Sequence, residues 1–195
     1  SLIVISGGVF VLPFFLFSSL AGQVADKYEK SGIIRRVKFV EIIVMGLGAI
    51  GFAMESAEFL FIVLFLMGTQ STFFGPLKYG ILPQHLAEKE LTGGNGLIQM
   101  GTYAAILMGA VAGGMLAAIE GFGPTPVVSC VVALALIGWL CARAIPTADA
   151  ADPTVVINWN LPRATFHLLR YAAGNREILT LVLTISWFWF VGATF

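Results

Sequence analysis

Charged residues are scarce in this chain of 195 residues, since only 11% are Asp, Glu, Lys or Arg while 58% are hydrophobic. Soluble domains carry about 25% charged residues, so the composition excludes an ordinary soluble globular protein. The 11 basic and 11 acidic residues cancel to a net charge of zero, which argues against a nucleic-acid partner. The composition therefore predicts an integral membrane protein.

Cysteine and histidine are also rare. Cys130 and Cys141 lie on one apolar run, and on a helix they would be about 16 Å apart, which excludes a disulfide between them. His85 and His167 are the only histidines, and neither stands in a spacing typical of metal ligands or beside a nucleophile motif. The sequence therefore predicts no metal site, no cofactor and no enzyme active site.

Long apolar stretches without charge dominate what is there. At a rise of about 1.5 Å per residue, runs of roughly 16–23 residues cross a ~30 Å hydrocarbon core, the shortest with help from their flanks. The stretches are residues 1–22, 39–54, 59–77, 97–119, 125–142 and 178–195. We expect an all-α bundle of six transmembrane helices. Because the chain begins and ends inside apolar runs, we expect it to be part of a longer transporter.

Basic residues occur only in alternate gaps between these stretches. The first, third and fifth gaps hold Lys27, Lys30, Arg35, Arg36 and Lys38, then Lys78 and Lys89, then Arg143, Arg163, Arg170 and Arg176. The second gap carries only Glu55 and Glu58, and the fourth only Glu120. Because Lys and Arg mark cytoplasmic loops, the chain is predicted to start outside, cross six times and end outside.

The fifth gap, residues 144–177, is a long cytoplasmic connection whose second part has a helical pattern. Asn160 is a candidate N-cap, and Pro162 falls in the first turn, where proline is tolerated. The helix is basic and amphipathic, which favours a position in the plane of the lipid headgroups, with a solvated linker helix as the alternative. Such a connection joins the halves of a two-half transporter, so we assign residues 1–143 to the first half and 178–195 to the first helix of the second.

The segment Gly22-Gln-Val-Ala-Asp26-Lys27 ends the first span at the cytoplasmic face. It resembles the signature of the major facilitator superfamily, Gly-x-x-x-Asp-Arg/Lys-x-Gly-Arg/Lys-Arg/Lys, but has Glu29 at the second glycine and Ser31 at a basic position. The resemblance implies that Asp26 accepts hydrogen bonds from the N-terminus of a helix in the other half and so locks one conformation. An ordinary charged loop is the alternative.

Two further stretches are Phe73-Phe74-Gly75-Pro76-Leu77-Lys78-Tyr79-Gly80-Ile81-Leu82-Pro83 and Ile185-Ser-Trp187-Phe188-Trp189-Phe190. They resemble the lysophospholipid transporter family of bacterial inner membranes, which has the major facilitator fold. The resemblance implies that residues 1–143 are family helices 2–6, and that the protein moves lysophospholipids, chiefly lyso-phosphatidylethanolamine, to the cytoplasmic leaflet by alternating access. It also implies an acyltransferase/acyl-carrier-protein synthetase partner, fused or separate. A generic facilitator exporting small molecules or drugs is the alternative.

Gly75 and Pro76 are expected to break the third span near the membrane edge. Lys78 would then lie beside free peptide groups and could hold a phosphate as a point charge, with a snorkelling anchor as the alternative.

Few polar side chains lie within the spans. Thr69, Gln70 and Gln99 are candidate cavity liners, with helix–helix hydrogen bonding as the alternative. Trp187 and Trp189 lie in the middle of the last span, where they would line the path of an acyl chain or simply pack. Including Lys78, these residues form the predicted substrate site. Glu41, a few residues inside the second span, is interpreted as an interfacial charge.

Overall fold

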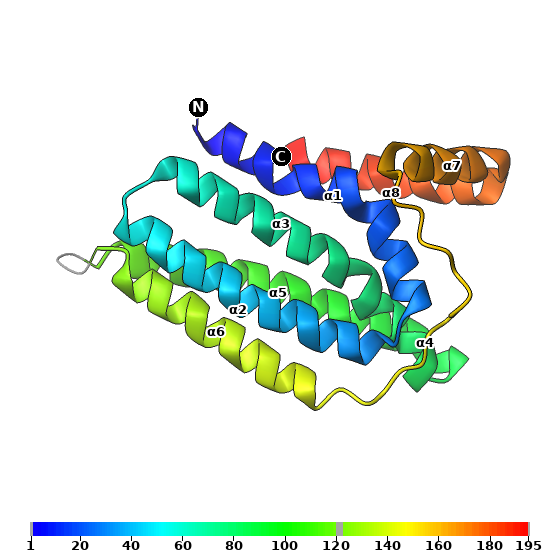
Figure 1. Ribbon diagram of the computed structural model, residues 1–195, viewed down its shortest axis with the longest axis horizontal. Coiled ribbons are helices and arrows are strands. Elements are labelled where there is room, and N and C mark those ends of the chain that lie inside the picture. The colour runs from blue at the N-terminus through cyan, green and yellow to red at the C-terminus, as the bar shows by residue number, and fades with distance from the viewer. Residues whose placement is uncertain (1, 120–122, 195) are drawn as a thin grey trace.

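A computed structural model describes residues 2–119 and 123–194, without the side chains of residues 3, 189 and 192–194 (Figure 1). Every element in these ranges is helical, as predicted. The elements are α1 (Leu2–Lys27), α2 (Lys30–Ala53), α3 (Ala57–Gly80), α4 (Leu82–His85), the 3-10 turn η1 (Glu88–Glu90), α5 (Leu91–Ala117), α6 (Thr125–Arg143), α7 (Leu161–Gly174) and α8 (Arg176–Thr194).

Four segments of the described chain are long and apolar enough to cross a membrane. They are Val4–Lys27, Ala57–His85, Glu88–Ala117 and Thr125–Arg143, which match the first, third, fourth and fifth predicted spans. The 24 residues of α2 are about 36 Å long, but they include the charges of Arg36, Lys38 and Glu41. The last predicted span lies in α8, which is described only in part. Crossing by α2 and α8 therefore stays a prediction.

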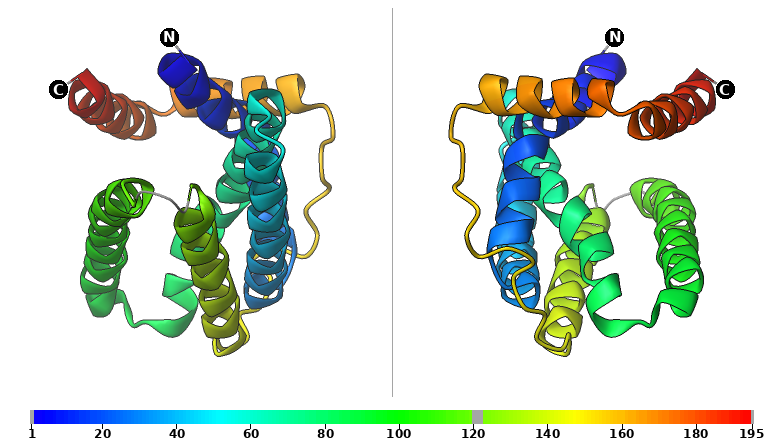
Figure 2. Two further views of the ribbon diagram at one scale, coloured as in Figure 1. Left: turned by 90° about the vertical axis from the view of Figure 1, so that its left-hand side faces the viewer. Right: turned by 90° about the vertical axis from the view of Figure 1, so that its right-hand side faces the viewer.

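The bundle is built around α3. Helix α1 packs along α3, α2 packs on the same helix, and α6 packs on α2. Close approach of α1 and α3 depends on Gly68, because a Cβ there would collide with the carbonyl oxygen of Phe10 and crowd Pro13. Helix α5 stands further out (Figure 2), and none of its residues is buried. The buried cluster lies at the predicted cytoplasmic end, where Ala25, Ile34, Leu77, Ile81, Ala142 and Ala148 meet.

The first cytoplasmic gap is much shorter than predicted. Only Tyr28 and Glu29 separate α1 from α2, because the Glu29 carboxylate caps α2 by accepting hydrogen bonds from the backbone N–H of Ser31 (2.8 Å) and Gly32 (2.6 Å). The basic residues Arg35, Arg36 and Lys38, which we expected in the gap, are therefore helical. Glu41 lies three turns from the start of α2, about 16 Å, and its interpretation as an interfacial charge stays a prediction.

The predicted break at Gly75 and Pro76 is also wrong, since α3 runs without interruption to Gly80. The proline ring fixes φ at a value that a helix accepts. Proline inside a helix still costs stability, because it lacks the N–H that would donate to the preceding turn and its ring crowds the carbonyl group four residues earlier. Gly75 has no Cβ to meet the ring of the following proline, which removes the main clash with the preceding residue. Lys78 therefore projects from a regular helix.

Residues 144–160, which we call the cytoplasmic strap, run across the ends of α1 and α2 (Figure 1). Ala148 donates its N–H to the Glu29 carboxylate (2.9 Å) and accepts the N–H of Lys30 (2.9 Å), while Asp152 donates to the backbone oxygen of Asp26 (3.0 Å). Three side-chain bonds extend the attachment, from Arg35 to Ile145 O, Gln84 to Asp149 O, and Asn158 N to Gln23. The predicted connection is thus fastened to the bundle.

The amphipathic helix is confirmed as α7. The Asn160 side chain accepts the N–H of Arg163 (3.1 Å), and Pro162 occupies the first turn, both as predicted. Ala164 is buried, and α7 packs on α1 and α8. Phe166 and other large apolar side chains remain exposed, as a helix in the headgroup plane requires.

The topology can be tested by cysteine labelling in a protein lacking Cys130 and Cys141. Glu55, Lys89 and Arg163 are all exposed, so a cysteine at any of them is accessible to a reagent on its side. A cysteine at Glu55 should react with a membrane-impermeant maleimide in intact cells, whereas cysteines at Lys89 and Arg163 should react only after permeabilisation. Labelling of Lys89→Cys from outside would contradict the predicted topology. Glu120 lies outside the described residues.

The Glu29 cap gives a second prediction. Burial opposes the charged carboxylate, but the backbone N–H groups of Ala148, Gly32 and Ser31 outweigh it and lower the pKa of Glu29 from 4.5 to about 2. Its contribution to stability is therefore present above pH 4.5 and is lost as the pH falls toward 2. Glu29→Ala should lower the free energy of unfolding in detergent by about 1 kcal/mol at neutral pH.

The difference between Glu29→Ala and the wild type should shrink as the pH is lowered through this window. Glu88→Ala, which removes an exposed carboxylate from η1, is the matched control and should have little effect. A difference that stays constant down to pH 2 would mean that the charge of the Glu29 carboxylate contributes nothing to the cap.

Candidate functional site

One face of α3 carries the site. Gln70, Phe74 and Lys78 recur at intervals of four residues, so they lie above one another along about 12 Å of the helix. We call this row the polar face of α3. It leads from the predicted cytoplasmic edge, at Lys78, toward the middle of the bundle, at Gln70.

Lys78 lies in a cleft of about 430 Å³ between α3 and α5. Its ammonium donates to the hydroxyl of Thr102 on α5 (3.3 Å) and lies 4.9 Å from the ring centroid of Tyr79. Apart from Lys78 and Thr102, the cleft is lined by Ile34, Phe74, Ile81, Leu97, Ile98, Gly101 and Ile145. A single cation therefore faces an otherwise apolar surface.

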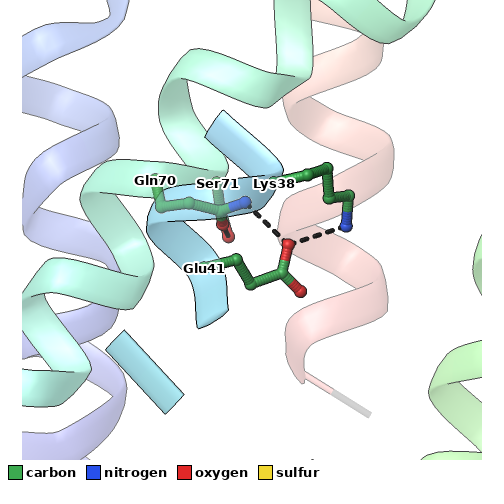
Figure 3. A network of polar contacts seen from close by, with 4 residues as sticks. All are labelled: Lys38, Glu41, Gln70 and Ser71. Carbon is green, nitrogen blue, oxygen red and sulfur yellow. Dashed lines mark hydrogen bonds and ion pairs between the residues drawn. The ribbon is translucent and has the colours of Figure 1, made fainter. Parts of the chain in front are cut away.

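A network of charged and amide groups lies two turns deeper (Figure 3). One carboxylate oxygen of Glu41 pairs with the ammonium of Lys38 (2.7 Å) and accepts a hydrogen bond from the Gln70 amide (3.0 Å). Ser71 donates to the Gln70 carbonyl oxygen (3.3 Å), so the amide is fixed from both ends. The network joins α2 to α3 near the middle of both helices.

Lys38 connects this network to the Lys78 cleft. Its ammonium lies 4.8 Å from the ring centroid of Phe74, which also lines that cleft. On the facing helix α6, a Cβ at Gly138 would make ordinary van der Waals contact with the ammonium at 3.7 Å, so the Lys38 side chain lies against α6. The side chains of Lys38 and Glu41 remain 22% and 20% exposed. The pair is thus covered but accessible.

Sequence reasoning missed Lys38 and Glu41 as site residues. Both were placed at or near the cytoplasmic edge because the start of α2 was expected near residue 39 rather than at Lys30. The signal that could have found them is the spacing of three between opposite charges, which is a favourable pair on a helix, combined with a glutamine in the middle of the next span.

Of the other predicted binding residues, Thr69 lines a cavity of about 230 Å³ together with Gln70, and the rest of those described lie apart from Lys78. Thr69 donates back to the oxygen of Phe65 (2.9 Å), and Gln99 is exposed on α5, away from the Lys78 cleft lining. Trp187 is 67% exposed on α8, and the side chain of Trp189 lies outside the described residues. Of the predicted set, only Gln70 and Lys78 share the polar face of α3.

The motif residues lie at the C-terminal end of α1. Gly22 is half-buried, the Asp26 side chain is exposed, and the Lys27 ammonium lies 5.9 Å from the ring centroid of Tyr28. No described residue forms an ion pair with the Asp26 carboxylate. This leaves Asp26 available for the predicted contact with another helix, which the described residues do not test.

The site holds two cationic side chains that could act as hydrogen-bond donors. Two ammonium groups, those of Lys78 and Lys38, lie at two depths along an apolar wall, and both can donate to phosphate oxygens. In the part of the chain that the structure describes, no group of three or more His, Cys, Asp or Glu side chains could hold a metal ion.

Comparison with curated proteins finds relatives named lysophospholipid transporter LplT, which confirms the resemblance noted in the sequence. The relative from Escherichia coli O1:K1 / APEC is 33% identical over 190 residues, or 95% of this chain and 45% of the relative. The relative from Enterobacter sp. (strain 638) is 31% identical over 189 residues, with the same coverage. The chain thus spans about half the length of these relatives. No family model matches it, and no solved structure matches it.

Proposed function

From the similarity to lysophospholipid transporters along 95% of the chain, we propose that this protein forms part of a major facilitator carrier for lysophospholipids. The carrier moves a lyso-phosphatidylethanolamine-like lipid across the bacterial inner membrane to the cytoplasmic leaflet. The observation that carries the proposal is the ammonium of Lys78 at the apolar cleft between α3 and α5. We assign no catalytic role to any residue.

A lysophospholipid presents two opposite requirements to its carrier. The phosphate must leave water, which is costly unless a partner compensates its charge. An ammonium about 4 Å away contributes about 4 kcal/mol where the effective dielectric constant is ~20. Lys78 supplies this charge, and Thr102 supplies a hydroxyl. The acyl chain requires only apolar surface, which the isoleucine-rich wall of the cleft provides.

The arrangement of the chain fits one half of a two-half carrier. Residues 1–143 would be family helices 2–6, the strap and α7 would form the connection, and α8 would begin the second half, in agreement with coverage of 45% of the relatives. Alternating access would rock the halves around the site, with Asp26 holding one closed state at the cytoplasmic face. An acyltransferase/acyl-carrier-protein synthetase would then re-acylate the delivered lipid.

Lys78 is tested in proteoliposomes of the full-length protein with fluorescent lyso-phosphatidylethanolamine. Hydrogen bonds to charged groups contribute ~1.5–3 kcal/mol, so Lys78→Ala should weaken binding at least about tenfold without loss of expression. Lys78→Arg should keep part of the affinity, because the charge stays and the geometry changes. Lys89→Ala, which removes an exposed loop lysine, is the control. Equal, small effects of Lys78→Ala and Lys89→Ala would refute the phosphate site.

Asp26 is tested separately, because its proposed role is in gating. Asp26→Asn keeps the shape of the side chain and removes its charge, and a charge at a helix terminus is worth up to ~2 kcal/mol. We expect normal insertion and unchanged lipid affinity, but a roughly tenfold lower transport rate. Transport at the wild-type rate would identify Asp26 as an ordinary loop charge.

A further inference from the structure

We propose that Lys38 is a second phosphate-binding cation, deeper than Lys78, and that Glu41 competes with the lipid phosphate for it. The inference rests on the proposed function and deepens it. An empty site would keep Lys38 paired with Glu41, and an occupied site would pair Lys38 with the phosphate. Glu41 is then a positioning residue that sets how tightly the headgroup is held and how readily it leaves.

The first argument is the unused donor capacity of Lys38. An ammonium has three N–H donors, and Lys38 gives one to Glu41 at 2.7 Å. Among the described residues, the ammonium also lies over the face of the Phe74 ring, and Gly138 opposite contributes no side chain. Because the side chain remains 22% exposed, an anion has both donors and room at this ammonium.

The second argument is that Glu41 is held in place independently of Lys38. Gln70 donates to the same carboxylate oxygen that pairs with Lys38, and Ser71 fixes the Gln70 amide in turn. Glu41 therefore keeps one hydrogen-bond donor when Lys38 turns to another anion. A carboxylate in the hydrophobic region that lost every partner would be too costly to allow such an exchange.

The third argument is continuity with the Lys78 cleft. Phe74 lines that cleft together with Lys78 and also lies under the Lys38 ammonium, so its ring borders both cationic positions. A phosphate leaving Lys78 would meet Lys38 next along the same face. The empty network has no net charge, since the charges of Lys38 and Glu41 cancel, so the deeper position costs less when vacant than an isolated lysine would.

A purely structural pair between α2 and α3 makes different predictions, and kinetics separates the two. The test uses the full-length protein in proteoliposomes with lyso-phosphatidylethanolamine and, as the lipid without phosphate, a monoacylglycerol of the same chain length. Binding of both lipids is also measured in detergent by tryptophan fluorescence, so that affinity is known whether or not transport occurs. Lys89→Gln is the control for loss of a lysine charge.

Glu41→Gln keeps the size of the side chain and an oxygen for Gln70, but frees the Lys38 ammonium. We expect the Kd and KM for lyso-phosphatidylethanolamine to fall about tenfold, which corresponds to about 1.4 kcal/mol of binding free energy. The maximal transport rate should fall as well, because release of the lipid slows. Lys38→Gln should raise Kd and KM about tenfold. The double variant Lys38→Gln/Glu41→Gln should behave as Lys38→Gln does. Monoacylglycerol binding should not respond to these changes.

The charge-exchanged variant Lys38→Glu/Glu41→Lys restores an ion pair and moves the cation by one turn. Recovery of wild-type Kd and KM in it would mean that the pair only fastens α2 to α3, and would overturn the inference. An unchanged or higher Kd for Glu41→Gln would also overturn it. If wild-type protein transports the lipid but the variants leave KM unchanged, only this inference fails. If the variants shift Kd as expected but wild-type protein moves no lipid, only the proposed function fails.

Discussion

A charge that enters hydrocarbon needs a partner, and this cost shapes most of what the chain does with its few charged residues. Lys38 and Glu41 enter the bundle together and cancel, and Gln70 secures the carboxylate from a second helix. Lys78 stays near the cytoplasmic end and turns to Thr102. Glu29 stays outside the apolar region and receives backbone N–H groups from two segments. Each polar cluster also joins two separate segments of the chain, so electrostatic pairing and packing support each other.

Packing on α3 explains why these clusters fall in a row. The helix has neighbours on two sides, with α1 approaching closely at Gly68 and α2 on the other flank. Gln70 and Phe74 lie on the flank that meets α2, and the same row continues to Lys78, which meets α5. Because Gly75 relieves the ring of Pro76, the helix stays regular through this region and keeps the interval of four that aligns the three residues.

The sequence alone predicted the helical fold, four of the apolar spans, and the N-cap of α7 at Asn160, because each depends on composition or on residues close together. It placed the start of α2 too late, because the capping of α2 by Glu29 also uses the distant N–H of Ala148. It found Lys78 and Gln70 as polar exceptions in apolar runs. Lys38 and Glu41 escaped notice because their role depends on contacts with α3 and α6 that no local pattern contains.

The cytoplasmic strap also limits how far α8 can move from the bundle. A flexible, unattached linker of n residues would let its two ends separate by a root-mean-square distance of about 5–6 Å × √n, the value for glycine-rich chains. Here the strap is hydrogen-bonded to α1 and α2, and α7 packs on α1. Between α7 and α8 stands a single residue, Asn175. Its side chain caps α8 by accepting the N–H groups of Glu177 and Ile178. The connection therefore leaves one residue, Asn175, between two packed helices, and it keeps α8 at a high effective concentration beside the bundle.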